Sequence, residues 1–307
     1  MAHHGHPSPR FGRVICAMVT PFSDAGDLDL DGAAELARWL VACGNEGLVV
    51  AGTTGESPTL SHDEQIDLIA AVTDAVDVPV LAGAGSNDTA AAVELTERAT
   101  AVGAAGILSV APYYNRPPQA GLYDHFRTII ESTHLPVIIY DIPVRTGRKV
   151  DTATLLSLAH DTENMAGIKD AAGDPAETGR LIAAAPEGFE VYSGDDALTL
   201  PLLAVGAVGV IGVATHWTAA EHLDMFAAWE RGDTAAAREI NASMGPSFDY
   251  ETGLAAPNPI PTKALLRVLG RPAGPCRPPM AAEPAGLADD ARATLATTRL
   301  GRELGFG

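Results

Sequence analysis

Lysine is scarce in this 307-residue sequence: of its 20 basic residues, only Lys149, Lys169 and Lys263 are lysines. Positive charge as a whole is outweighed, because 39 acidic residues bring the formal net charge to -19. Proteins that bind nucleic acids or anionic membranes carry clustered basic surfaces, so the composition argues against both partners. Since arginine supplies positive charge elsewhere, each lysine raises the question of whether a removable proton is needed there.

Cysteines and long apolar runs are also few. Cys16, Cys43 and Cys276 are odd in number and widely spaced, with neither a disulfide framework nor zinc-ligand spacing. This usage is typical of a reducing cytosol and predicts a cytoplasmic protein. The longest apolar run, residues 200–214, is broken by Pro201 and is shorter than the roughly 20 residues of a membrane-spanning helix. The N-terminus lacks the basic start and apolar core of a signal peptide.

Eight short runs rich in apolar and β-branched residues recur along the chain and alternate with longer amphipathic stretches. Most are apolar at nearly every position rather than at alternate positions, which is typical of parallel strands covered on both faces. We expect strands at residues 14–19, 47–51, 79–84, 106–111, 136–140, 165–169, 189–192 and 207–214.

The stretches between these runs carry helix start signals, and Ser61 followed by Glu64 has the spacing of a capping box. Eight strands that are each followed by a helix predict an α/β protein with a (β/α)8 TIM-barrel fold. A doubly wound open sheet is the alternative. That fold usually has a glycine-rich phosphate loop after its first strand, whereas residues 19–22 are Val-Thr-Pro-Phe.

We predict three parts in the chain, namely a disordered leader at 1–10, the barrel at 11–232 and a C-terminal helical region at 233–307. The leader contains His3, His4 and His6 among prolines and glycines, and we interpret it as a tail rather than a metal site. In the C-terminal region we expect helices at 234–244, 261–269 and 288–304.

Lys169 is the sharpest candidate for chemistry. It ends an apolar run, and the active sites of TIM barrels lie at the C-terminal ends of the strands. Burial lowers the pKa of a lysine because it disfavours the charged form, and the neutral amine can attack a ketone to form a Schiff base. The alternative is a structural ion pair of Lys169 with Asp170 or Asp141.

Other polar residues follow neighbouring strands. The Tyr140 phenol can pass protons as a general acid or base, or it is a core tyrosine. Thr53 and Thr54 can hold a carboxylate or relay a proton, or they serve the turn that contains them. Arg145 can grip a carboxylate with two hydrogen bonds, or it forms a surface ion pair.

Two adjacent aspartates, Asp195 and Asp196, lie in a Ser-Gly-Asp-Asp turn. Carboxylates offer metal ligands, but two of them without a histidine favour capping of the turn. We therefore predict no metal site.

These segments, in this order, resemble the dihydrodipicolinate synthase family, which belongs to the N-acetylneuraminate lyase superfamily of class I pyruvate aldolases. The resemblance covers roughly residues 11–270. It depends on segments 52–57, 112–115, 140–147, 167–170, 193–196 and 258–263. It implies a TIM barrel with a C-terminal helical region, commonly assembled as a homotetramer, with a dimer as the alternative.

The resemblance also implies an activity: condensation of pyruvate with L-aspartate 4-semialdehyde to 4-hydroxy-tetrahydrodipicolinate, in lysine and diaminopimelate biosynthesis. Neither a metal nor an organic cofactor is implied. Two alternatives stay open. One is another pyruvate aldolase or a 2-keto-3-deoxy-sugar-acid lyase or dehydratase of the superfamily, and the other is a non-catalytic barrel.

Four residues match the catalytic residues of the family. By this resemblance Lys169 forms the Schiff base, and Tyr140 shuttles protons above it. Thr53 is similar to the relay threonine of the family. Tyr114 is similar to a relay tyrosine that is lent across a subunit interface.

Further matches concern the binding of substrates. Thr54 resembles a contact of the pyruvate carboxylate, and Arg145 resembles a contact of the semialdehyde carboxylate at the entrance. Gly194 and Ile211 resemble main-chain positions near bound pyruvate. Lys263 also matches a motif lysine, and we expect it to have a structural role.

One departure from the family concerns regulation. Lysine-inhibited members have an effector pocket, and four of its residues have counterparts here in Ser57, His62, Asn87 and Tyr113. Gln65 and Ala91 stand where those members have a histidine and a glutamate. Because the missing carboxylate would pair with the amine of the effector, we predict weak or absent feedback by lysine.

Overall fold

A computed structural model describes residues 8–307 of the chain. His3, His4 and His6 lie outside the described residues, and so does most of the leader predicted at 1–10. Of the last three residues of that segment, Ser8 and Pro9 precede the first turn of the fold, and Arg10 begins it.

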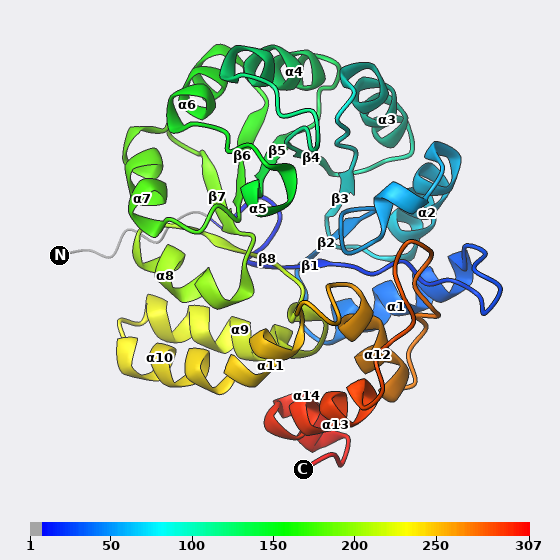
Figure 1. Ribbon diagram of the computed structural model, residues 1–307. Helices are drawn as coiled ribbons and strands as arrows, with labels where there is room; N and C mark the ends of the chain where they lie inside the picture. The colour runs from blue at the N-terminus through cyan, green and yellow to red at the C-terminus, as the bar shows by residue number, and fades with distance from the viewer. Residues whose placement is uncertain (1–7) are drawn as a thin grey trace.

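Eight parallel strands form a closed barrel in which each strand pairs with the next and β8 returns to β1 (Figure 1). This closure confirms the predicted TIM barrel and shows that the open-sheet alternative is wrong. The strands are β1 (Val14–Ala17), β2 (Gly47–Val50), β3 (Val80–Gly83), β4 (Gly106–Val110), β5 (Val137–Asp141), β6 (Met165–Asp170), β7 (Glu190–Ser193) and β8 (Gly209–Gly212).

A ring of helices surrounds these strands (Figure 1). It consists of α1 (Leu30–Ala42), α2 (His62–Ala75), α3 (Thr89–Ala101), α4 (Gln119–Glu131), α6 (Thr152–Asp161), α7 (Pro175–Ala184), α8 (Thr199–Ala204) and α9 (Thr215–Glu230). Helix α2 has the predicted capping box, because Ser61 and Glu64 each accept a hydrogen bond from the main chain of the other. Short turns at the strand ends are α5 (Pro143–Thr146), η1 (Ser57–Thr59) and η2 (Asp196–Leu198).

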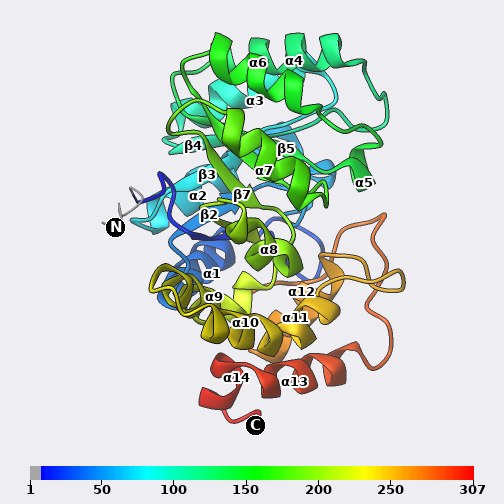
Figure 2. The same ribbon diagram turned by 90° about the vertical axis from the view of Figure 1, so that its left-hand side faces the viewer.

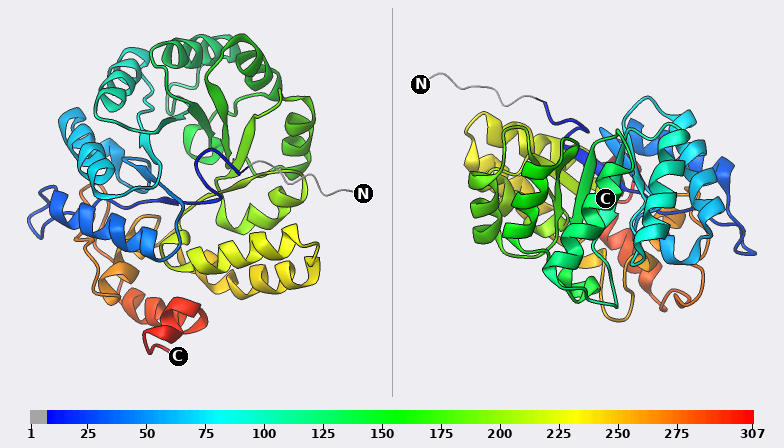
Figure 3. Two further views of the ribbon diagram at one scale, coloured as in Figure 1. Left: turned by 180° about the vertical axis from the view of Figure 1, so that it is seen from behind. Right: turned by 90° about the horizontal axis from the view of Figure 1, so that it is seen from above.

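The strands are buried on both faces, as their apolar runs predict. Successive side chains of a strand point to opposite faces, so alternate residues fill the barrel and contact the helices. The interior contains Ile15, Val49, Leu81, Leu108 and Ile138. Phe11 packs at the closed end, where a side chain on Gly106 would come within 2.6 Å of its ring. Figure 3 shows the segment before β1 crossing the barrel at this end, seen from behind.

The C-terminal region consists of α10 (Thr234–Ser243), α11 (Gly245–Tyr250), α12 (Ile260–Val268), α13 (Leu287–Thr297) and α14 (Arg299–Glu303). Helix α10 packs on α9, and α13 packs against α11 and α12 on one flank of the barrel (Figure 2).

Two of the three predicted C-terminal helices are confirmed, at 234–244 and 261–269. The helix predicted at 288–304 is wrong as one element. It breaks at Thr298, whose backbone is extended and whose hydroxyl caps α14 by accepting from Gly301. The sequence prediction also missed the short helix α11. No helix within residues 8–307 is both long and apolar enough to span a membrane.

Candidate active site

A cavity of about 520 Å³ opens at the C-terminal ends of the strands. Six residues predicted for the site line it together: Thr53, Thr54, Tyr140, Arg145, Lys169 and Gly194. They come from the ends of four strands, β2, β5, β6 and β7, or from the loops that follow them, and the barrel places them around one space.

Lys169 lies on β6, in register with Tyr140 on β5. Its side chain is 5% exposed, and its Nζ lies 4.3 Å from the centre of the Tyr140 ring. Burial lowers the pKa of the amine to about 8, although Asp196 and Glu251 oppose this shift. An appreciable fraction of the amine is therefore neutral near neutral pH.

The ion-pair alternative for Lys169 is wrong. Asp141 and Asp170 each follow a cavity residue on their strand, so they point to the opposite face of the sheet. There Asp141 lies near Lys149, and Asp170 accepts a hydrogen bond from Thr178. Among residues 8–307, no carboxylate forms an ion pair with Lys169.

Gly194 follows β7 and contacts the stem of the lysine. A Cβ at this position would lie 3.0 Å from both Cγ and Cε of Lys169, and 3.0 Å from Ala171. A larger residue at position 194 would therefore displace the amine. Because Gly194 has no side chain, the stem of Lys169 can lie where it brings the amine into the cavity.

Tyr140 is buried at the end of β5, beneath the lysine amine. Burial raises the pKa of its phenol well above the usual value. The hydroxyl is therefore protonated across the neutral range, and it begins any proton exchange as a donor.

The loop after β2 is held by the C-terminal region. The side-chain amide of Asn258 donates to Oγ1 of Thr54 at 2.9 Å. Glu56, whose backbone is left-handed, pairs with Lys263 at 2.6 Å and accepts from the main chain of Arg277 at 2.9 Å. Lys263 thus has the structural position that the sequence predicted, whereas nothing in the sequence pattern linked Glu56 to it.

Two predicted residues lie outside this cavity. Tyr114 is 92% exposed and has a left-handed backbone, so it does not reach the cavity of its own chain. The Ile211 side chain is buried among apolar residues inside the barrel.

Arg145 lies exposed at the cavity mouth on α5. Within the described chain it forms no ion pair, so the surface-pair alternative is wrong for it.

Asp195 caps the turn, as predicted, whereas Asp196 ties the turn to the segment after β8. Asp195 accepts from the main chain of Ala197 at 3.0 Å, and Asp196 accepts from that of Val213 at 2.8 Å. Both residues also line the cavity, together with Glu251 and Asn258 from the C-terminal region. Glu251 was missed from the sequence, because it follows a short helix that carries no strand or motif signal.

The family model described as "Dihydrodipicolinate synthetase family" matches residues 10–297. The chain belongs to this family. Its relatives include the 4-hydroxy-tetrahydrodipicolinate synthase of Moorella thermoacetica, 48% identical over 88% of this chain and 92% of that protein. The synthase of Acidothermus cellulolyticus is 50% identical over 89% of this chain and 88% of its own length.

Solved structures of the same family agree with the fold. A dihydrodipicolinate synthase from Cyanidioschyzon merolae with lysine bound has a TM-score of 0.91 and 40% identity, covering 94% of this chain and 99% of that one. The synthase of Bacillus anthracis has a TM-score of 0.89 and 40% identity, covering 92% and 97%. The predicted enzyme class is confirmed, and the names of the relatives favour the predicted condensation over a sugar-acid lyase or a non-catalytic barrel.

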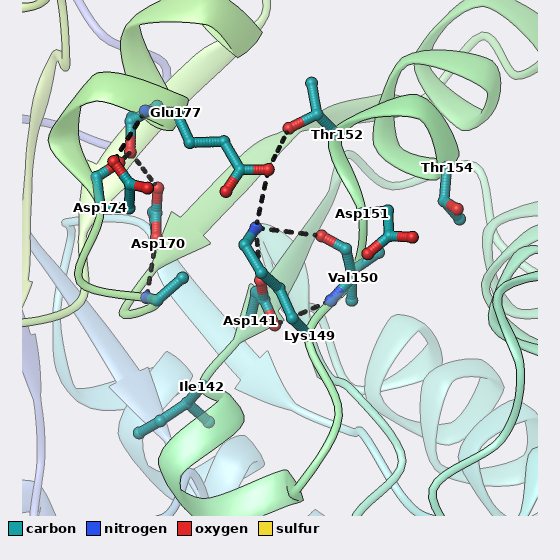
Figure 4. A network of polar contacts seen from close by, with 12 residues as sticks. Asp141, Ile142, Lys149, Val150, Asp151, Thr152, Thr154, Asp170, Asp174 and Glu177 are labelled. Carbon is teal, nitrogen blue, oxygen red and sulfur yellow. Dashed lines mark hydrogen bonds and ion pairs between the residues drawn. The ribbon is translucent and has the colours of Figure 1, made fainter.

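In this family member, a polar network backs β5 and β6 on their outer face (Figure 4). Lys149 Nζ lies 3.7 Å from Asp141 Oδ2 and 3.5 Å from Glu177 Oε1, and it donates to the Val150 carbonyl at 3.3 Å. Asp141 is fully buried, and burial raises the pKa of its carboxyl to about 6. The network ties β5 to α7 directly behind Tyr140.

Proposed function

We propose that this chain condenses pyruvate with L-aspartate 4-semialdehyde through a Schiff base on Lys169, as a cytoplasmic enzyme of lysine and diaminopimelate biosynthesis. The observation that carries the proposal is the buried, unpaired amine of Lys169, whose pKa is lowered to about 8, on the phenol ring of Tyr140. A neutral amine in such a pocket is a nucleophile for ketones. The three free cysteines support a reducing compartment.

The first half of the reaction uses pyruvate alone. Its carboxylate docks on Thr53 and Thr54, and the Lys169 amine attacks the ketone carbon. Tyr140 supplies and removes protons while water leaves, with Thr53 as the relay. The resulting iminium loses a methyl proton and becomes an enamine, because the cationic nitrogen draws the electron pair. The protein amine thus provides the activation that a cofactor would otherwise supply.

The second half builds the product. Arg145 holds the carboxylate of the semialdehyde at the mouth, and the enamine carbon attacks the aldehyde. The substrate's own amine then displaces Lys169 and closes the ring. By the family resemblance, the main chain at Gly194 and Ile211 is near bound pyruvate in this proposal, while the Ile211 side chain belongs to the apolar interior of the barrel.

A second copy of the chain completes the relay in this proposal. Tyr114 is exposed and held in a left-handed conformation outside its own cavity, which supports its donation to a neighbouring subunit. We infer a homotetramer, with a dimer as the smaller unit that already supplies this residue.

Feedback by lysine is weak or absent in this proposal. The Gln65 amide donates to the main-chain carbonyls of Ser57 and Leu60 at 3.3 and 3.4 Å, so its hydrogen-bonding groups serve the loop. Ala91 offers no carboxylate to a bound amine. Titration with lysine should leave turnover nearly unchanged, and strong inhibition at cellular lysine concentrations would contradict the proposal.

The test of the function is turnover with pyruvate and L-aspartate 4-semialdehyde, measured against a panel of 2-keto-3-deoxy sugar acids. Condensation with the semialdehyde is expected, and cleavage or dehydration of the sugar acids is not. Borohydride reduction in the presence of pyruvate, followed by peptide mass spectrometry, should place the label on Lys169. A label elsewhere, or activity only on sugar acids, would overturn the proposal.

A further inference from the structure

The turn that carries Thr54 is fixed by the residues that follow it. The Gly55 carbonyl accepts a hydrogen bond from the Thr20 hydroxyl at 2.6 Å. The Glu56 carboxylate pairs with Lys263 on α12, also at 2.6 Å. The main chain at Thr54 is therefore held in place by groups other than its own side chain.

The Thr54 side chain contacts the C-terminal region through its hydroxyl group. It is buried and lines the cavity, and its Oγ1 lies 2.9 Å from Nδ2 of Asn258. A hydroxyl has one proton to donate and two lone pairs that accept. No acceptor for the Thr54 proton is found among residues 8–307. Whether this proton is available to the cavity thus depends on how the Asn258 amide is turned.

Thr262 decides the orientation of this amide. Its hydroxyl is fully buried at the start of α12, and a buried hydroxyl proton needs an acceptor. Within the described part of the chain that acceptor is Oδ1 of Asn258, 3.2 Å away. The amide oxygen therefore faces Thr262, and the amide nitrogen, which can only donate, faces Thr54. With the amide turned over, the Thr262 proton would have no acceptor.

A chain of hydrogen bonds thus runs from the protein interior to the cavity. Thr262 donates to Asn258, and Asn258 donates to Thr54. Because the amide occupies a lone pair of Oγ1, the Thr54 proton remains for an acceptor in the cavity that also holds Lys169. A carboxylate can only accept, and hydrogen bonds to charged groups are stronger than those between neutral ones. The arrangement favours a ketone that carries a carboxylate.

We propose that Asn258 is a positioning residue that makes the Thr54 hydroxyl a hydrogen-bond donor to the carboxylate of the keto acid. This inference rests on the proposed function, in which Thr54 binds the carboxylate of pyruvate. Asn258 acts through Thr54 and not on the reacting atoms. It therefore contributes to the affinity for pyruvate and leaves the reactivity of Lys169 unchanged.

Asn258→Asp tests the direction of the hydrogen bond. The introduced carboxylate has nearly the shape of the amide and still accepts from Thr262, but it cannot donate. It accepts the Thr54 proton instead, and the hydroxyl then offers only lone pairs to pyruvate. We expect the dissociation constant for pyruvate, measured by titration calorimetry, to rise about 10- to 100-fold. Borohydride trapping on Lys169 at saturating pyruvate should stay close to wild type, which also shows that the variant is folded.

The same substitution in a Thr54→Val background separates the orientation of the hydroxyl from other effects. Thr54→Val alone weakens pyruvate binding, because it removes the donor. Adding Asn258→Asp should then weaken binding no further, since there is no hydroxyl left to orient. Repulsion of pyruvate by the new charge, or a shift of the turn, would persist in this background and would contradict the inference.

Thr262→Val is a second, milder variant that acts from outside the cavity. It frees the Asn258 amide to turn over, so pyruvate should bind more weakly than to wild type but more tightly than to Asn258→Asp. If Asn258→Asp does not fold, wild-type affinity in Thr262→Val overturns the inference.

Asn45→Asp is the matched control. The Asn45 amide is also buried and donates to the main-chain carbonyls of Leu40 and Thr215 at 3.0 and 3.1 Å. This variant should bind pyruvate like wild type. The inference is overturned if Asn258→Asp binds pyruvate like wild type, or weakens binding equally with and without the Thr54 hydroxyl. A wild-type enzyme that binds pyruvate but is not labelled on Lys169, or does not accept the semialdehyde, overturns the proposed function instead, and the binding measurements still decide the role of Asn258.

Discussion

Lys169 and Lys263 are both buried, but the protein treats them in opposite ways. Lys263, on α12, has Glu56 at 2.6 Å and donates to the Pro275 carbonyl at 2.9 Å. Lys169, on β6, has no such carboxylate, and its amine lies against an aromatic ring. Burial lowers the pKa of both amines, but the Glu56 carboxylate opposes this shift at Lys263 through a direct ion pair, whereas no such pair stabilises the charged form of Lys169. Burial alone therefore does not distinguish a reactive lysine from a structural one, and its partners do.

The most severe test of this comparison is Lys169→Arg. The guanidinium keeps the positive charge but has no nucleophilic amine near neutral pH, so no adduct forms. We expect loss of detectable condensation and of borohydride trapping. The control is Lys149→Arg, at the partly exposed third lysine. This variant should retain both condensation and borohydride trapping. Condensation by Lys169→Arg at the wild-type rate would contradict the whole mechanism.

Lys263→Met tests the structural side of the comparison. It leaves the Glu56 carboxylate buried without its cation, and breaking a buried pair in this way costs about 3–5 kcal/mol. We expect the free energy of unfolding, measured with denaturant, to fall by that amount. The double variant Lys263→Met/Glu56→Gln should recover part of the loss, because the uncompensated charge is gone. An unchanged unfolding midpoint in Lys263→Met would show that the pair contributes nothing.

The third lysine gives an intermediate case. Lys149 is partly exposed and lies between Asp141 and Glu177, yet Asp141 itself is buried with its pKa raised from 3.8 to about 6. Because the folded protein holds the Asp141 proton more tightly than the unfolded chain does, this proton stabilises the fold fully below the ordinary pKa of the carboxyl group. The stabilisation is lost as pH rises through the pKa of the folded protein. From about pH 4 to pH 7 this loss approaches about 3 kcal/mol, at about 1.4 kcal/mol for each unit of pKa.

Asp141→Asn should remove that pH dependence, because an amide does not titrate. Denaturant unfolding of both proteins at several pH values between 4 and 7 measures the difference. The wild type should lose stability relative to the variant as pH rises. Parallel curves would mean that Lys149 compensates the carboxylate fully.

The sequence predicts the barrel and most of the cavity for a physical reason. Runs such as 136–140 and 165–169 are apolar because they are covered on both faces, so a polar residue at the end of such a run has to face the open end of the barrel. Tyr140 and Lys169 follow this rule. Glu56, Asn258 and Glu251 could not be placed in the same way, because their positions depend on how the C-terminal region folds back over the strand ends. The break between α13 and α14 at Thr298 was also missed. A threonine that caps a new helix within an amphipathic stretch looks, in the sequence, like one more residue of a single helix.

The smallest predicted effect concerns the reactive amine itself. With a pKa of about 8, Lys169 is mostly charged at pH 6 and mostly neutral at pH 9. Only the neutral form attacks pyruvate, so the rate of trapping at low pyruvate should rise about tenfold per pH unit below 8 and level off above it. An exposed lysine would keep rising toward its ordinary pKa of about 10.4. A plateau reached only near that value would mean that the pKa of Lys169 is close to that of an exposed lysine despite its burial. The nearby carboxyl groups of Asp196 and Glu251, which raise this pKa, would then offset the effect of burial.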